Sequence, residues 1–244
     1  EDLNSIIRKM ISHENVASRA VVFESYDKQV QGRTIIEPGM SDAGVMAPFN
    51  SDDYPKEIRK VGIALSTDHN PGQNKINPYL GGLNATLEAM RNVAAVGATP
   101  HALSDCLCFG NPEKPHQMWE FVEAVKGVSD ACKGVKLKEH PESPTPIIAG
   151  NVSFYNESKS GSIPPSPIIS CLGKMKDVDK AITMSFKKTN SKLFMIGKRK
   201  DELGGSLYYN LFGELGANVP NPNLNEVKHQ IYAITDCIDD KLIE

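Results

Sequence analysis

Apolar residues recur at helical spacing in two long stretches of the chain, and each stretch predicts an amphipathic helix. In the first, expected over 82–96, one apolar stripe is formed by Leu83, Leu87, Met90 and Ala94. In the second, expected over 116–133, the apolar face comprises Met118, Phe121, Val122, Val125, Val128 and Cys132, and Trp119 is expected in the core. Because a striped helix must bury its apolar side, we expect both helices to cover one face of a sheet.

Short apolar or alternating runs, bounded by turn-forming residues, predict the strands. They lie at 61–66, 100–105, 146–149, 168–172 and 192–197, with further strand-and-turn structure around 21–23 and 33–36. The continuous run at 146–149 predicts a buried strand, and the strand at 100–105 is expected to end on Asp105. Shorter helices are expected over 3–11, from about Leu207 and from Val227 to Glu244. Strands and helices alternate loosely, so the expected class is α/β or α+β, with a mixed sheet covered by helices.

The helix at 82–96 has two further features. Gly81 and Gly82 are expected to precede it, which would leave its N-terminus exposed as a natural anion site. Its polar face carries Asn84, Glu88 and Arg91. For this face, solvated surface and a role in ligand binding are equally open.

Composition narrows the possible partners. The 244 residues carry 27 basic and 30 acidic side chains, a net charge of -3, so there is no basic field for nucleic acid. No apolar run approaches the roughly 20 residues of a membrane helix, and the N-terminus lacks the features of a signal peptide. The five cysteines are odd in number and scattered, and Cys106 and Cys108 stand too close for the usual zinc pair. Reduced thiols in a cytoplasmic protein are therefore expected.

The first residue is not Met, and the last residues fall inside a predicted helix. We therefore expect a piece of a longer protein. Two domains are expected, one over 1–175 and the start of a truncated α/β domain over 176–244, with the polar stretch 177–192 near their boundary.

The stretch 150–157 (Gly-Asn-Val-Ser-Phe-Tyr-Asn-Glu) carries the most specific chemistry, because it follows a predicted strand directly. Gly150 lets a ligand approach the backbone. The Asn151 carbonyl is a hard oxygen ligand suited to Mg²⁺ beside a phosphate, and the Ser153 hydroxyl can donate to an anionic oxygen. The alternative is an ordinary strand end with turn-forming polar residues.

A set of ordered motifs resembles a known enzyme family. The motifs are Ser66-Thr67-Asp68, Gly81-Gly82, residues 104–115, residues 150–157 and residues 201–206. Together they resemble the C-terminal half of the large (synthetase) subunit of phosphoribosylformylglycinamidine synthase. The resemblance covers the chain from about residue 20 onward. It implies an aminoimidazole-ribonucleotide-synthetase-like fold and an ATP-dependent ligase of purine biosynthesis, which makes formylglycinamidine ribonucleotide with ammonia from glutamine.

The resemblance also implies roles for single residues. Asp105 and Gly150 would contact ATP, Asn151 would hold Mg²⁺, and Ser153 would contact the substrate phosphate. The catalytic His of the family is expected in a separate N-terminal half, so no catalytic residue is assigned to this chain. A glutaminase subunit and a small accessory subunit are the other implied partners.

Three departures from the family pattern stand out. Ser104 and Cys108 replace a Thr and an Asn, and Asn92 stands where the first half has a metal-binding carboxylate. The loop at 133–146 is longer than usual.

Two other functions remain open: a related ATP-using synthetase or kinase of the same superfamily, and a non-catalytic half whose main role is pairing. With its partner half absent, the chain would expose an apolar sheet surface. A homodimer that lacks activity on its own is therefore expected.

Overall fold

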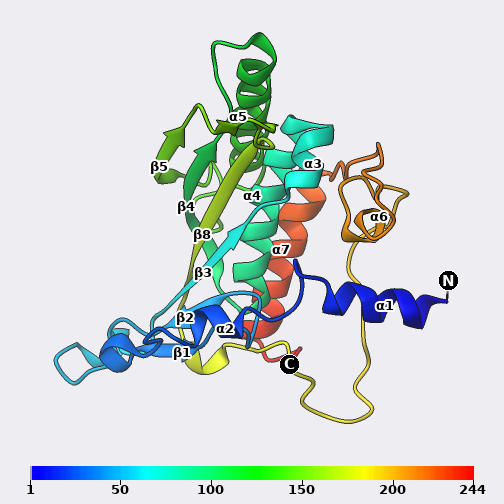
Figure 1. Ribbon diagram of the computed structural model, residues 1–244. Coiled ribbons are helices and arrows are strands. Elements are labelled where there is room, and N and C mark those ends of the chain that lie inside the picture. The colour runs from blue at the N-terminus through cyan, green and yellow to red at the C-terminus, as the bar shows by residue number, and fades with distance from the viewer. Residues whose placement is uncertain (1) are drawn as a thin grey trace.

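The computed structural model describes residues 2–244, which fold around one mixed sheet (Figure 1). The sheet has six strands in the order β1-β2-β3-β8-β4-β5. They are β1 Thr34–Ile36, β2 Gly44–Met46, β3 Gly62–Asp68, β8 Ser166–Met175, β4 Thr99–Cys108 and β5 Ile147–Ser153. The β4–β5 pair is parallel, and the other neighbours are antiparallel. A small hairpin is formed by β6 Glu157–Ser158 and β7 Gly161–Ser162.

The long helices α4, α5 and α7 gather on one side of this sheet (Figure 1). The α-helices are α1 Leu3–Ser12, α2 Ala20–Phe23, α3 Pro71–Ile76, α4 Pro78–Ala95, α5 Pro115–Gly134, α6 Leu207–Asn210 and α7 Leu224–Asp239. Helix α4 packs on β3, β4 and β8, and both α5 and α7 pack against α4. The expected mixed sheet with its two long helices on one face is confirmed. Within residues 2–244, no helix combines the length and the apolar character needed to cross a membrane.

The core lies between the sheet and α4. Along β8, buried and half-buried residues alternate, and the buried set includes Ile169 and Cys171. These side chains meet the fully buried Leu87, Met90 and Val93 of α4. Within residues 2–244, the long helices α4, α5 and α7 leave the opposite face of the sheet uncovered, and Leu65 on that face is 55% exposed. The sheet therefore has one covered face and one open face.

The start of α4 differs from the prediction. The helix begins at Pro78, and the Asn77 side chain caps it by accepting a hydrogen bond from the backbone N–H of Leu80. Gly81 and Gly82 are buried inside the helix, where a Cβ on Gly82 would lie 2.4 Å from the Ala124 carbonyl oxygen of α5. The two glycines therefore allow close helix packing, and the expected anion site at an exposed Gly-Gly N-terminus is wrong.

The buried face of α5 carries smaller side chains than the sequence predicts. The residues that pack against α4 are small, among them Ala124, Gly127 and Ala131. Trp119, expected in the core, is 51% exposed and stacks on His116. The close approach of α4 leaves room only for small side chains, so the larger ones turn outward.

The apolar run at 146–149 is not buried. It belongs to β5, which forms an edge of the sheet, and Ile148 is 67% exposed. Strand β4 extends to Cys108, which places Asp105 inside the strand and not at its end.

The expected strand at 192–197 is wrong, since these residues form an exposed irregular segment that loops away from the sheet (Figure 1). The stretch around 21–23 is a short helix, whereas 34–36 is a strand as expected. Helix α7 ends at Asp239, before the predicted Glu244. The domain boundary near residue 176 stays a prediction.

Candidate functional site

Asp105 and Gly150 face each other across the parallel β4–β5 pair. A Cβ on Gly150 would lie 2.3 Å from Oδ1 of Asp105, so the carboxylate occupies the space that any other residue would need. Position 150 therefore requires glycine, because any larger side chain would displace the Asp105 carboxylate.

Asp105 lies at a hollow of about 270 Å³ under α5. The other walls are mainly apolar and include Leu107, Val128 and Ile147. Burial raises the pKa of the Asp105 carboxyl, and the hydrogen bond from the Asn151 backbone lowers it part of the way. An apolar hollow with one carboxylate suits a flat, partly apolar ligand with a hydrogen-bond donor.

Asn151 and Ser153 lie on the other face of β5, because successive side chains of a strand alternate between faces. Asn151 is exposed and stands beside Cys106 of β4, whereas Ser153 is half-buried beside Cys108. The structure thus gathers all four predicted site residues at one edge of the sheet, but on two faces. Strand β5 is that edge, so a ligand that reaches around it can touch both faces.

The turn after β5 holds Ser153 in place. The Asn156 amide donates to the backbone oxygen of Ser153 at 2.9 Å, to its hydroxyl at 3.1 Å, and to the Phe109 carbonyl at 3.0 Å. Tyr155 adopts a left-handed conformation, with φ of 59°, which turns the chain back for these bonds. Asn156 was part of the sequence motif but had no predicted role, because its partner Phe109 lies far away in sequence.

The same turn joins the two most specific motifs. Lys114 forms an ion pair with Glu157 at 2.8 Å, and the backbone N–H of Tyr155 donates to the Gly110 carbonyl at 3.1 Å. Beneath them, Phe121 packs edge-on against both Phe109 and Phe154. Residues 104–115 and 150–157 therefore form one structural unit.

A second polar group lies where β3 meets α4. The sequence analysis ended the strand at residue 66 and named Asp68 only as part of a motif, whereas β3 extends to Asp68. Asn92 donates to Oδ1 of Asp68 at 2.8 Å, and Oδ2 of Asp68 is buried without a partner in the described chain. Burial and, after it, the negative charge of Glu88 raise the pKa of Asp68 to about 6. Burial also raises the pKa of Glu88, although its side chain still reaches solvent between neighbouring residues. The available signals were the motif Ser66-Thr67-Asp68 and the departure of Asn92 from the family pattern.

Asn84, also on the polar face of α4, has a structural role. Asn84 donates to Oε1 of Gln73 at 3.1 Å and to the Pro220 carbonyl at 2.8 Å. It ties the chain after α6 to α4, and it is neither a solvated residue nor an open ligand.

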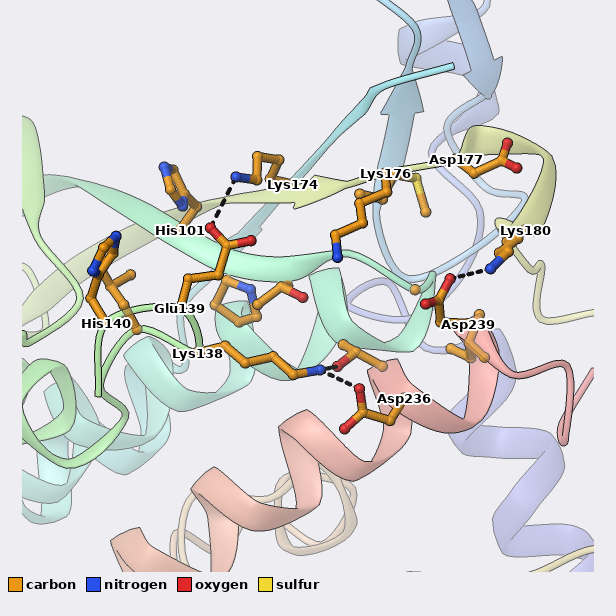
Figure 2. Close-up of a pocket in the computed structure, with 17 residues that line it drawn as sticks. His101, Lys138, Glu139, His140, Lys174, Lys176, Asp177, Lys180, Asp236 and Asp239 are labelled. Atoms are coloured by element: carbon orange, nitrogen blue, oxygen red, sulfur yellow. Dashed lines mark hydrogen bonds and ion pairs between the residues drawn. The ribbon is translucent and has the colours of Figure 1, made fainter. Parts of the chain in front are cut away.

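A separate polar hollow of about 250 Å³ lies at the other end of the sheet (Figure 2). Residues 137–140 of the long loop form one wall, and α7 forms another. Lys174 pairs with Glu139 at 3.3 Å, Lys138 pairs with Asp236, and Lys180 pairs with Asp239. Lys176 reaches toward the middle of the hollow. The charges here largely balance one another, and none of the predicted site residues lines the hollow.

The donor set for Mg²⁺ is sparse. Among residues 2–244, no three His, Cys, Asp or Glu side chains come together in a way that could hold a metal ion. The exposed Asn151 can supply one neutral oxygen, while the Asp105 carboxylate faces the other side of the sheet. Mg²⁺ usually needs carboxylates together with substrate phosphates, so Asn151 fits only as one ligand of a site completed from elsewhere.

This fold defines a class of mixed α/β domains, with helices on one face of the sheet and polar strand ends at its edge. The chain belongs to the AIR synthase related protein family, whose N-terminal domain matches residues 40–175.

Two relatives match this chain over its full length. The phosphoribosylformylglycinamidine synthase subunit PurL of Methanothrix thermoacetophila is 50% identical over 244 residues, which are 100% of this chain and 31% of the relative. The same subunit of Methanocaldococcus jannaschii is 36% identical over 250 residues, which cover 100% of this chain and 32% of the relative. The chain thus spans about a third of the length of these relatives. They confirm the resemblance expected from the motifs.

Solved structures agree with the fold. The structure of PurLQS from Thermotoga maritima matches with a TM-score of 0.53 and 28% identity, over 68% of this chain and 25% of that chain. The T. maritima PurL complexed with FGAR matches with a TM-score of 0.57 over 92% of this chain and 30% of that chain. At 23% identity the second likeness concerns the fold alone.

Proposed function

We propose that the chain is part of an ATP-dependent amidoligase of purine biosynthesis. The enzyme converts formylglycinamide ribonucleotide and glutamine-derived ammonia to formylglycinamidine ribonucleotide. One observation carries the proposal: residues 104–115 and 150–157, the two motifs most specific to the synthetase subunit, form one unit at the sheet edge through Lys114 and Glu157. The identity of 50% to a PurL subunit over the full chain supports it.

At this edge Asp105 and Gly150 would contact ATP, as the PurL of T. maritima does bind ATP in its complex. The Asp105 carboxylate fills the space beside Gly150 and lines the hollow under α5, which is where a nucleotide would meet it. Asn151 would give one oxygen to Mg²⁺, and the Ser153 hydroxyl, held by Asn156, would donate to the substrate phosphate.

The chemistry assigned to this half is mainly positioning. ATP transfers its terminal phosphoryl group to the substrate amide oxygen, and ammonia then displaces phosphate from the same carbon. Bound Mg²⁺ would neutralise the phosphate charge. The chain's own groups orient the reactants, which is the larger part of catalysis in phosphoryl transfer. The catalytic His would come from the N-terminal half of the subunit.

The open sheet face supports the proposed pairing with that half. Met46 and Leu65 lie on this face, at 40% and 55% exposure, and Leu172 is paired with Leu65 in the sheet register. An apolar face of this kind favours association, and a second copy of this chain can cover it when the N-terminal half is absent. A glutaminase subunit and a small accessory subunit, the partners implied by the family resemblance, would complete the assembly; the T. maritima relative was solved as PurLQS. We expect the enzyme to act in the cytoplasm.

A segment exchange tests the proposal. This chain replaces the matching 31% of the M. thermoacetophila subunit, and the hybrid is assayed with ATP, ammonia and formylglycinamide ribonucleotide. Formation of formylglycinamidine ribonucleotide is the expected result, while this chain alone should make none. A folded hybrid that phosphorylates a different substrate would favour a related kinase or synthetase. A folded hybrid without any product would favour a pairing half without catalytic contacts.

A further inference from the structure

Cys106 and Cys108 form a close pair of thiols on the open face of β4. Their sulfur atoms lie 3.7 Å apart, and both residues are half-buried. Their partners on β5, the edge strand next to β4, are Asn151 and Ser153. On the other side the partners are Ile168 and Ser166 of β8. The two sulfurs therefore lie side by side among apolar groups and hard oxygen atoms.

A disulfide does not fit this pair well. Neighbouring residues on one face of a strand are two rises apart, roughly 6.6–6.8 Å between Cα atoms. That separation is at the upper end of what a disulfide spans, roughly 4.4–6.8 Å. Closing the bond would therefore strain or bend β4, which is held by β5 on one side and β8 on the other.

A metal ion fits better because it bridges a longer gap. Metal–thiolate bonds of roughly 2.3 Å, as for zinc, let two sulfurs up to about twice that distance apart share one ion. The present 3.7 Å is shorter than the roughly 4.6 Å of two such bonds in line, so the two side chains must separate by about 1 Å to hold a two-coordinate ion between them. Zinc itself usually takes four nitrogen or sulfur ligands, whereas the nearest other donors here are hard oxygens of Asn151 and Ser153. Two soft thiolates without further soft ligands select a soft ion that accepts two-coordination.

We propose that Cys106 and Cys108 form a binding site for a soft, thiophilic metal ion of the Cu(I) type. Each thiol releases its proton to solvent, two sulfur–metal bonds form, and copper remains in the +1 state. The site goes beyond the proposed ligase function and stands independently of it. Since Cys106 and Cys108 adjoin Asn151 and Ser153, an ion bound there would also crowd the ligands proposed for Mg²⁺ and the substrate.

The protonation of the free thiols fits this site. Protonated thiols react slowly with alkylating reagents but still bind a metal ion. Burial raises the pKa of Cys108, and the hydrogen bond with Cys106 raises it further. A protonated thiol is a weak nucleophile, whereas a metal ion displaces the proton when it binds.

Anaerobic titration of the reduced chain with Cu(I), against a chromogenic Cu(I) chelator, tests the proposal. One equivalent should bind and produce copper–thiolate absorbance in the ultraviolet. Loss of a group that only supports a metal ligand already weakens metal binding by roughly 10–100-fold. Cys106→Ser and Cys108→Ser remove a ligand itself, so each should weaken binding by more than about 100-fold. Cys237→Ser is the matched control, because Cys237 is also half-buried but stands alone on α7. It should bind as the unaltered chain does.

A second measurement needs no variant. Maleimide labelling of the unaltered chain, mapped by peptide mass, should show that Cu(I) protects Cys106 and Cys108 together and leaves Cys237 reactive. Equal protection of Cys237, or binding that survives both serine variants, would overturn the site. Rapid loss of both thiols to an internal disulfide in air would also contradict it, because the strand would then tolerate the closure judged unfavourable above.

Discussion

The amide of Asn156 holds the hydroxyl of Ser153 at 3.1 Å while it also binds the end of β4 through the Phe109 carbonyl. One side chain thus fixes both the position of a candidate substrate ligand and the junction between two strands. The left-handed Tyr155 between them brings the amide into reach.

Replacing this amide should therefore destabilise the fold. Asn156→Ala removes three hydrogen bonds from partly buried groups, and we expect the free energy of unfolding to fall by about 1–3 kcal/mol. Urea denaturation followed by circular dichroism measures the change. The exposed Asn221→Ala is a matched control and should stay within about 0.5 kcal/mol of the unaltered chain. Equal stability of the two variants would show that the turn does not depend on Asn156.

The contact between Gly150 and Asp105 should appear as coupling between the two positions. Gly150→Ala puts a Cβ 2.3 Å from the carboxylate, and overpacking of this kind costs about 1–3 kcal/mol. Asp105→Ala should relieve much of that cost, so the double variant should be more stable than the sum of the single changes predicts. Gly44→Ala is the control, because its nearest neighbour is an ordinary 3.8 Å away. Strictly additive effects would rule out the contact.

The close packing of α4 and α5 predicts that Gly127→Ala lowers stability, whereas helix propensity alone would predict a gain. In an exposed helix, Gly→Ala is favourable by about 1 kcal/mol. At Gly127 of α5, however, a Cβ would lie 1.9 Å from the Tyr79 carbonyl oxygen, so Gly127→Ala should destabilise the chain markedly. Thermal denaturation should show a lowered midpoint. A raised midpoint would mean that α4 and α5 do not approach this closely.

The carboxyl of Asp68 makes stability depend on pH. Burial, followed by the charge of Glu88, raises its pKa to about 6, above the roughly 3.9 of an unfolded chain. The folded state then holds the proton more tightly, so the free energy of unfolding should decrease as pH rises from about 4 to about 6. The raised pKa of Glu88 acts in the same direction. Asp68→Asn should flatten this slope, while the exposed Asp201→Asn should not. Urea midpoints at several pH values provide the comparison.

The proposed ligand roles predict different kinetic effects in the segment-exchange enzyme. Asn151→Ala removes a metal ligand near the reacting phosphate and should lower kcat. Ser153→Ala removes a contact to a part of the substrate that does not react, so it should mainly raise KM for the ribonucleotide. Steady-state rates at varied substrate, with Ser158→Ala in the hairpin as the control, separate the two effects. An unaffected Asn151→Ala enzyme would contradict the metal role.

The sequence predicted those parts of the fold that are set by local pattern. The stripe of Leu83, Leu87 and Met90 identified α4 and its buried side correctly, because a helix satisfies its own backbone and needs only one surface to cover. Strands depend on partners that periodicity does not reveal. The apolar runs at 146–149 and 192–197 look alike in sequence, yet the first is an exposed edge strand and the second pairs with nothing in the described chain.

The candidate site shows the same limit. The motif residues Gly150, Asn151 and Ser153 were found from their chemistry and their resemblance to a family. The contact of Gly150 with Asp105 was not, since it depends on the register of two strands far apart in sequence. Asp68 was missed for a similar reason: its burial comes from α4, and no local pattern carries that information.

The strand order has a consequence for how the chain is made. Strand β8, which ends at Met175, lies between β3 and β4, and those two strands do not pair with each other directly. During synthesis, one hydrogen-bonding edge of β3 and one of β4 therefore stay unpaired until β8 has left the ribosome. Pairings across such long stretches of chain form slowly, and waiting edges invite capture by other chains. The interval between the synthesis of β4 and β8 is thus the time when the nascent chain most needs protection by chaperones.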